Sequence, residues 1–410
     1  AHGQDQQIPL RLVPLVMAST WLTHLTGGSA GREGVAVQIG ATLSHWLGRR
    51  LPLRNAAPTF AVVGMAAGFA GLFRTPLAAT VFALEVLAAG RLRYEALAPA
   101  LAASLVASAT SGALGLAKFE VAVAPLAALD APVTLRLALA GLAFGVAGGA
   151  FAWLLSRGKS VAARLLPNPV ARAAAMGAGL SAVLLVLWGG RYCGLGTNLI
   201  EAAIAGAGQD VLPWDWALKL ALTVLTLSAG YQGGEVTPLF SIGACLGVVL
   251  AGPLGLPVAL AAALGYAAVF GAATNTFLAP LLIGGEVFGW ANLPAVFVVC
   301  AAAYLFNMGK TIYAGQLPGS VGLAGARGRS SSCVGHVAAL ESVCAPPARL
   351  GDKRREPAWH SFARSASSDR ATWARTWQTA CSCRVWQTSS TSPTSTRRSW
   401  RASARTSPTP

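Results

Sequence analysis

GGSAGREGVAVQIGATL, at residues 27–43, is matched 203 positions later by GYQGGEVTPLFSIGACL, at residues 230–246. Both stretches carry an Ile-Gly-Ala triplet in the same register. A second pair of blocks follows in the same order, since residues 64–85 match residues 265–286 at an offset of 201 and each block ends in a glutamate. Self-similarity at a fixed offset indicates repeated structural units. The sequence therefore predicts two homologous halves, and the pattern leaves open whether they are inverted or parallel in a membrane.

The composition is that of a membrane protein. Hydrophobic residues make up 54% of the 410 positions and charged residues 11%, against about 25% charged in an ordinary soluble domain. The net charge of +16 is concentrated near the carboxyl end, because 14 of the 31 basic and 4 of the 15 acidic residues lie at or beyond Arg327. Residues 1–326 carry 17 basic and 11 acidic residues, a net +6. We therefore expect neither a soluble enzyme nor a nucleic-acid partner.

Apolar runs follow one another up to about residue 323. A helix needs about 20 apolar residues to cross a hydrocarbon layer of about 30 Å, so several of the longer runs can span: residues 97–116, 133–155, 173–188, 216–229 and 293–306. Shorter segments that Gly or Pro interrupts or bounds are residues 35–47, 60–73 and 236–250. Broken helices at membrane depth are typical of binding sites. We expect an all-α, multi-pass integral membrane protein, in the inner or plasma membrane if the source is bacterial.

The two glycine-rich turns are candidate anion-binding elements. A helix N-terminus presents unpaired N–H groups and about half a positive charge, and glycine lets an ion approach the backbone closely. The residues that would contact the anion are Gly31, Arg32, Gly34 and Val35 in the first half, and Gly234, Val236 and Thr237 in the second. Close helix packing is the alternative explanation for the glycines. Packing does not explain why both turns carry an acidic residue.

Four glutamates stand in otherwise apolar surroundings, where an ionised carboxylate costs roughly 2.5–3.5 kcal/mol on insertion scales. Glu33 is either an ion-pair partner of Arg32 or a group that occupies the place of the anion and leaves when protonated. The second role would tie anion passage to protons, and Glu235 is the next candidate for it. For Glu85 and Glu286 we expect buried structural hydrogen bonds.

Other chemistry has little support in the sequence. His24 and His45 are the only histidines in the apolar part, and no HExxH or GxSxG motif is present. Cysteines 193, 245 and 300 lie singly in apolar runs and are best explained as small buried hydrophobes. We expect no enzyme activity, no metal site and no cofactor.

The predicted organisation has three parts. Residues 1–130 hold what the chain contains of the first half, residues 131–326 hold the second half, and residues 327–410 form a tail rich in Ser, Thr, Arg and Trp. No apolar period survives in the tail, so we expect it to be disordered. It is either a cytoplasmic regulatory segment or an out-of-frame translation of a GC-rich region.

The stretches GGSAGREGVAVQIG, GFAGLFRTPLAATVFALE, GGEVTPLFSIGA and GAATNTFLAPLLIGGEVFG resemble the CLC family of chloride channels and anion/proton exchangers. The resemblance covers roughly residues 9–320. It implies an inverted-repeat homodimer in the lipid bilayer with a separate anion pathway in each subunit. It also implies that Glu33 is the gating, proton-linked glutamate and that Tyr313, in KTIYAGQ, contacts the central anion.

Two departures refine the resemblance. Val35 replaces the proline that usually follows GREG, and GGEVTP is similar to the fluoride-exporting branch, where the residues matching Glu235 and Thr237 belong to the ion and proton pathway. We therefore expect a fluoride/proton antiporter. The alternatives are a chloride channel or chloride/proton exchanger of the same family, and a non-functional truncated remnant. The truncated remnant is an alternative because family members have several helices ahead of the GREG turn, and we expect the corresponding residues to lie upstream of Ala1.

Overall fold

The computed structural model describes residues 8–52, 56–87, 92–126, 128–205, 208–313 and 315–316. The predicted tail, residues 327–410, lies outside these ranges, and so does the boundary before it. The predicted boundary at residue 130 stays a prediction. The described residues form α-helices joined by turns and short 3₁₀ segments, with one isolated β-bridge. The expectation of an all-α protein with broken helices is confirmed.

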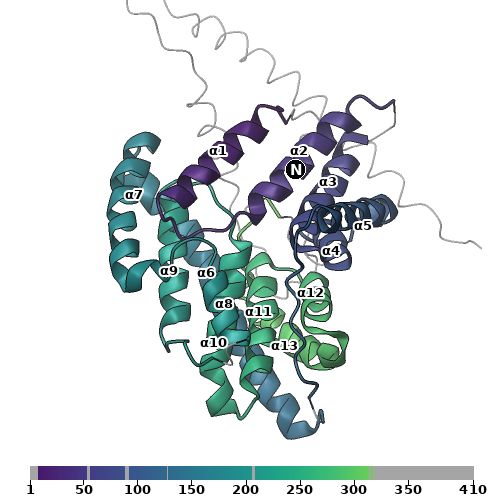
Figure 1. Ribbon diagram of the computed structural model, residues 1–410, viewed down its shortest axis with the longest axis vertical. Helices are drawn as coiled ribbons and strands as arrows, with labels where there is room; N and C mark the ends of the chain where they lie inside the picture. Colours follow the sequence, from purple (N-terminus) through teal and green to yellow (C-terminus); the bar gives the residue numbers. More distant parts are fainter. Residues whose placement is uncertain are drawn as a thin grey trace, which may run out of the picture. The chain divides into compact units, whose positions relative to one another are not determined.

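The helices fall into three consecutive groups (Figure 1). The first is α1 (Leu12–Leu25), α2 (Glu33–Gly48), α3 (Ala56–Phe73), α4 (Pro76–Glu85), η1 (Tyr94–Ala96) and α5 (Leu97–Ala113). The second is α6 (Ala131–Leu165), α7 (Pro169–Val186), η2 (Leu187–Gly190) and α8 (Thr197–Ile204). The third is α9 (Asp215–Ser228), α10 (Val236–Leu254), α11 (Val258–Thr274), α12 (Leu278–Phe288), η3 (Trp290–Asn292) and α13 (Leu293–Leu305). The third group repeats the first element by element.

Helix packing repeats as well. α2 packs on α3, and α10 packs on α11. A Cβ atom on Gly64 would collide with the carbonyl oxygen of Gly40, and a Cβ atom on Gly243 would collide with that of Gly265. These four glycines occupy equivalent positions in the two halves, so they allow the same close backbone contact twice.

Backbone conformation follows the same repeat. Arg74, the residue that follows α3, has φ 56°. Asn275, the equivalent residue after α11, has φ 54°. Left-handed backbone is uncommon for residues other than glycine. Its occurrence at both members of an aligned pair supports the alignment independently of residue identity.

Glutamates 85 and 286 show how the halves are oriented. Glu85, at the end of α4, accepts hydrogen bonds from the backbone N–H groups of the residues that open α12: Phe277, Leu278 and Ala279, at 2.6–3.2 Å. Glu286, near the end of α12, accepts them from Leu77 and Ala78 at the start of α4, at 3.1 and 2.8 Å. Each helix end thus caps the start of the other, which requires α4 and α12 to be antiparallel. Such reciprocity marks a two-fold relation, and the repeat is inverted.

The lengths of several helices differ from the sequence expectation. Among the described residues, four segments are long and apolar enough to cross a membrane: 56–73, 94–113, 131–165 and 236–254. Two of them were expected to be too short. α3 begins earlier than expected, and α10 continues past residue 250, with Pro253 inside the helix, until Gly255 ends it with φ 59°. Conversely, α9 and α13 have 14 and 13 residues, about 20 Å of helix, which is short of a bilayer.

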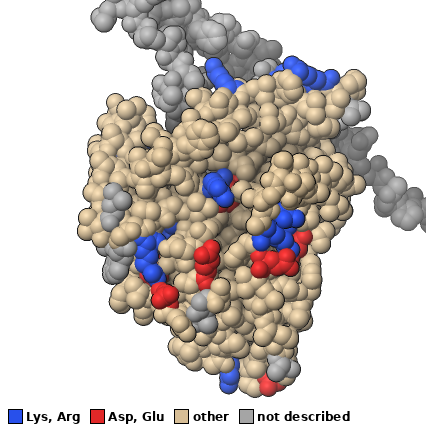
Figure 2. Space-filling view, in the orientation of Figure 1, with Lys and Arg blue, Asp and Glu red and all other residues tan. Residues whose placement is uncertain are grey.

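Buried residues concentrate on α10, α11 and α12. α11 lies at the centre, where all its residues from Leu260 to Thr274 are buried. The outer helices α1 and α5 expose large apolar side chains such as Trp21, Leu22 and Val106. Figure 2 shows that most of the face in view is neither acidic nor basic, with charges in small separate clusters. Such a surface suits contact with lipid.

Candidate functional site

The two glycine-rich turns meet at the centre of the inverted repeat. We call residues 27–32 the Gly31 turn and residues 230–235 the Gly234 turn. Gly31 N–H donates to the Gly234 carbonyl, and Gly234 N–H donates to the Gly31 carbonyl, both at 2.7 Å. α2 begins two residues after Gly31, and α10 begins two residues after Gly234. The N-termini of two helices are therefore held together by one pair of hydrogen bonds.

Glu33 lies at this junction. Its side chain is 1% exposed, and its Oε2 accepts a hydrogen bond at 3.5 Å from the backbone N–H of Thr237 in the first turn of α10. The same oxygen would collide with a Cβ atom on Gly31 and would lie 3.0 Å from one on Gly234. The carboxylate therefore folds back over its own turn to the start of α10, where helix dipoles and free N–H groups favour a negative charge.

Two hydroxyls of α10 are unsatisfied. Thr237 Oγ1 and Ser241 Oγ, one turn apart on α10, are buried and have no hydrogen-bond partner within the described part of the chain. A buried hydroxyl without a partner costs about 1–3 kcal/mol. The Thr237 hydroxyl stands in the first turn of α10, where the Glu33 carboxylate accepts from the Thr237 N–H.

A cavity of about 170 Å³ gives access to the junction. Its wall includes Glu33, Thr237 and Tyr266, together with Arg32 and Glu201. Arg32 and Glu201 are exposed, so the cavity reaches the surface. Arg32 contributes its side chain to the wall of this cavity and makes no salt bridge with Glu33 in the structure.

The other predicted site residues are placed as follows. Val35 and Val236 are buried in the first turns of α2 and α10, and a Cβ atom on Gly34 would lie 3.4 Å from Gly234 Cα. Glu235, at the N-cap of α10, faces Lys159 of α6, with Oε1 4.0 Å from Nζ. Its side chain is 20% exposed, and it does not belong to the wall of the Glu33 cavity as described.

Tyr313 follows α13 and is held beside α11. The backbone N–H of Ile312 donates to the Ala273 carbonyl at 2.9 Å, and the Tyr313 ring lies 6.4 Å from that of Phe82. Phe82 contacts Phe270, which contacts Phe240 of α10. The structure thus joins Tyr313 to α10 through aromatic rings, while the described wall of the Glu33 cavity does not include it.

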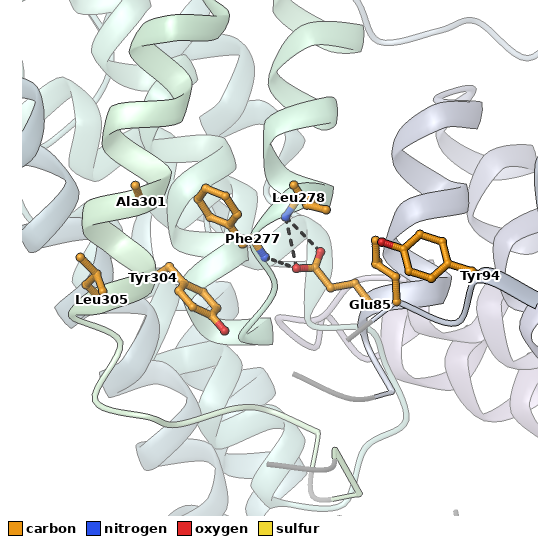
Figure 3. Close-up of a pocket in the computed structure, with 8 residues that line it drawn as sticks. Glu85, Tyr94, Phe277, Leu278, Ala301, Tyr304 and Leu305 are labelled. Atoms are coloured by element: carbon orange, nitrogen blue, oxygen red, sulfur yellow. Dashed lines mark hydrogen bonds between the residues drawn. The ribbon is translucent and has the colours of Figure 1, made fainter. Parts of the chain in front are cut away.

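A larger cavity, of about 750 Å³, lies where α4 and η1 face α12 and α13 (Figure 3). Glu85 reaches its wall, but the carboxylate is already bonded to Phe277 and Leu278 N–H groups, as the dashed lines show. The remaining wall is mostly apolar and includes Tyr94 and Tyr304. The expectation of structural hydrogen bonds for Glu85 and Glu286 is confirmed.

Sequence reasoning missed one buried charge near the site. Lys219, in the middle of α9, is 0% exposed and contacts the Gly31 turn. A lysine inside the apolar run 216–229 is itself a functional signal. Among the described residues, no group of three or more His, Cys, Asp or Glu side chains could hold a metal ion.

The family follows from comparison with known proteins. Residues 1–308 match the family described as voltage gated chloride channel. The chain belongs to this CLC family. A CLC-type fluoride/proton antiporter of known structure is 53% identical, with a TM-score of 0.75, and the match covers 77% of this chain and 80% of that one. The similarity to the fluoride-exporting branch is thereby confirmed.

Two further CLC relatives differ in their sequence identity to this chain. A chloride/fluoride channel protein of Pseudomonas syringae pv. tomato is 37% identical over 325 residues, which is 78% of this chain and 71% of that protein. An H⁺/Cl⁻ exchange transporter, ClcA, of Salmonella paratyphi A is 28% identical over 260 residues, 58% of this chain and 51% of that protein. The chain is thus a membrane-embedded member of a family of halide channels and halide/proton exchangers.

Proposed function

We propose that this CLC protein exchanges fluoride for protons across a membrane, with Glu33 as the gate. The observation that carries the proposal is the Glu33 carboxylate at the joined N-termini of α2 and α10, accepting from Thr237 N–H. A carboxylate held where an anion would bind competes with that anion. Once protonated, it loses its attraction to the helix ends and yields the place.

The transport cycle follows from this competition. With Glu33 ionised, the junction is closed by the carboxylate itself. Protonation through the 170 Å³ cavity releases Glu33, and the anion then binds to the α10 N–H groups and to the Thr237 hydroxyl. Return of the ionised carboxylate displaces the anion, so each passage is linked to a proton. Glu235, beside Lys159 and outside the cavity wall, is the candidate for proton exchange from another direction.

The preference for fluoride rests on hydrogen bonding. Fluoride is small and strongly hydrated, so its site must replace water with short, direct donors. The unpartnered Thr237 hydroxyl and the backbone N–H groups at the start of α10 are such donors. The fluoride/proton antiporter at 53% identity supports this assignment more strongly than the chloride exchanger at 28%.

A selectivity measurement tests the proposal. The protein is reconstituted in liposomes loaded with equal fluoride and chloride, and efflux of each ion is followed with ion-selective electrodes after a valinomycin shunt is added. Fluoride efflux is expected to exceed chloride efflux at equal gradients. Equal or faster chloride efflux would favour the chloride channel or chloride/proton exchanger and would end the fluoride assignment.

The protein is further proposed to act as a transporter without enzyme activity, as a homodimer with one pathway in each subunit. Apolar side chains exposed on α5 and α13, among them Leu105, Val106, Phe297 and Leu305, offer surface for a second subunit or for lipid. Mass photometry in nanodiscs distinguishes the two, because a dimer has twice the mass of the 41.8 kDa chain.

A further inference from the structure

Lys219 forms a buried junction beneath the Gly31 turn. Its Nζ donates to Ser29 Oγ at 3.0 Å, to the Tyr192 carbonyl at 3.1 Å and to the Gly194 carbonyl at 2.7 Å. Ser29 stands four residues before Glu33 and is itself 0% exposed. One side chain of α9 therefore connects the turn that leads into the gate with the loop that precedes α8.

Other contacts close the same junction. The Gly194 N–H donates to the Gly28 carbonyl at 3.0 Å, so the loop before α8 also bonds the Gly31 turn directly. Thr223 Oγ1 lies 3.1 Å from Ser29 Oγ, and Ser29 N–H donates to Thr226 Oγ1 at 3.2 Å. Lys219, Thr223 and Thr226 all belong to α9, so the first-half turn is held by a second-half helix.

The equivalent position in the other half of the repeat shows that the fold does not require a lysine at this junction. Thr23 of α1 is equivalent to Thr226, and its hydroxyl donates to the carbonyl of Gln232, the equivalent of Ser29, at 2.8 Å. A threonine therefore holds each turn. The equivalent of Lys219, by contrast, is Val16. A lysine is therefore present at only one of the two equivalent positions, the one that contacts the Gly31 turn.

Buried lysine is costly unless its donors are satisfied and its charge is useful. Asp215, one turn away on α9, carries an acidic side chain. It accepts hydrogen bonds from the Arg191 guanidinium, the Tyr192 hydroxyl and the Leu212 backbone N–H. The hydrogen-bond partners of the Lys219 ammonium are instead a hydroxyl and two backbone carbonyls. Its stem is confined too, since a Cβ atom on Gly196 would lie 2.8 Å from Lys219 Cε.

We infer that Lys219 is a positioning residue for Glu33. It fixes the Gly31 turn so that α2 starts opposite the first N–H groups of α10, and it thereby sets how tightly anion movement is coupled to protons. The inference rests on the proposed gating role of Glu33. Lys219 itself does not contact the anion in this scheme and acts through Ser29.

Hydrogen exchange tests the positioning without any transport assay. Lys219→Met keeps the length of the stem and removes all three donors, and Ser29→Ala removes one acceptor. Both are expected to raise amide exchange in residues 27–34 about tenfold or more, while residues 278–288 keep wild-type exchange. Thr80→Val is the control, because the Thr80 hydroxyl bonds only within α4, to the Pro76 carbonyl. Unchanged exchange at residues 27–34, or a rise in both segments alike, would overturn the inference.

A double-mutant cycle tests the coupling. Lys219→Met is expected to lower the number of protons moved per fluoride in the wild-type background and to change nothing further in Glu33→Gln. Equal losses of anion flux in both backgrounds would mean a merely structural role and would overturn the inference. If Glu33→Gln itself keeps proton coupling, the proposed gate fails, and the exchange measurement still decides whether Lys219 positions the turn.

Discussion

Glu33 and Thr237 belong to different halves of the chain, yet the Glu33 carboxylate accepts a hydrogen bond from the Thr237 backbone N–H at 3.5 Å. The bond crosses the two-fold relation that Gly31 and Gly234 define. A buried carboxylate thus occupies the N-terminus of a helix that has an acid, Glu235, at its N-cap and an unsatisfied threonine hydroxyl in its first turn. The proposed gating by Glu33 depends on this one contact.

Fluoride binding should depend on pH through Glu33. In the wild type, binding weakens as pH rises, because the ionised carboxylate occupies the place of the anion and repels it. Glu33→Gln removes the charge, so its fluoride affinity should be nearly independent of pH. Isothermal titration at several pH values checks this. Glu95→Gln, at an exposed residue that pairs with Arg93, is the control. A pH dependence that survives in Glu33→Gln would assign the competing group elsewhere.

Thr237→Val should weaken fluoride binding by about tenfold to a hundredfold, because a donor to a charged ligand contributes about 1.5–3 kcal/mol. Stability should change little, since the hydroxyl has no partner among the described residues. ¹⁹F NMR titration measures the affinity. Thr80→Val, which removes a hydroxyl bonded within its own helix, should leave it unchanged. Wild-type affinity in Thr237→Val would remove the hydroxyl from the site.

Glu85→Gln and Glu286→Gln should lower thermal stability while keeping the proton-to-anion ratio. Glu85 accepts from three N–H groups and Glu286 from two, so the loss should be larger for Glu85, by about 1 kcal/mol for the additional bond. Melting temperatures in detergent rank the variants. A changed ratio in either variant would show that the caps take part in transport.

Gly64→Ala and Gly243→Ala should each disrupt folding, because the added Cβ would strike a backbone carbonyl of the adjacent helix. Gly179→Ala is a matched control inside α7, where a Cβ atom meets nothing within 4 Å, and it should stabilise the helix by roughly 0.5–1 kcal/mol. Monodispersity on size exclusion reports the outcome. Normal folding of both core variants would contradict the close packing of α2 on α3 and of α10 on α11.

Much of this architecture was predictable because the repeat constrains it. The matched glutamates 85 and 286, in apolar surroundings, had to find donors, and the start of a helix is where free N–H groups are available. The sequence could not decide between inverted and parallel halves, since an offset carries no direction. Only the mutual bonds of Gly31 with Gly234, and the reciprocal caps, settle that point.

Other features lay beyond sequence reasoning for identifiable reasons. α10 runs past its predicted end at residue 250, with Pro253 inside the helix, and it ends at Gly255 in the left-handed conformation, whereas composition alone suggested an earlier stop. Lys219 was overlooked because its partners are a serine and two carbonyls, which no spacing motif marks. The salt bridge of Glu235 with Lys159 could not be foreseen, because α6 brings Lys159 from 76 positions earlier in the chain.

The central claim is that anion movement through the Glu33 site drives protons in exchange. The most direct measurement uses proteoliposomes with a fluoride gradient, no initial pH gradient and the membrane potential held at zero, with internal pH and external fluoride recorded together. The account predicts that protons move opposite to fluoride and against their own gradient, and that Glu33→Gln stops the proton movement. Fluoride efflux with no proton movement in the wild type, or undiminished proton movement in Glu33→Gln, would contradict it.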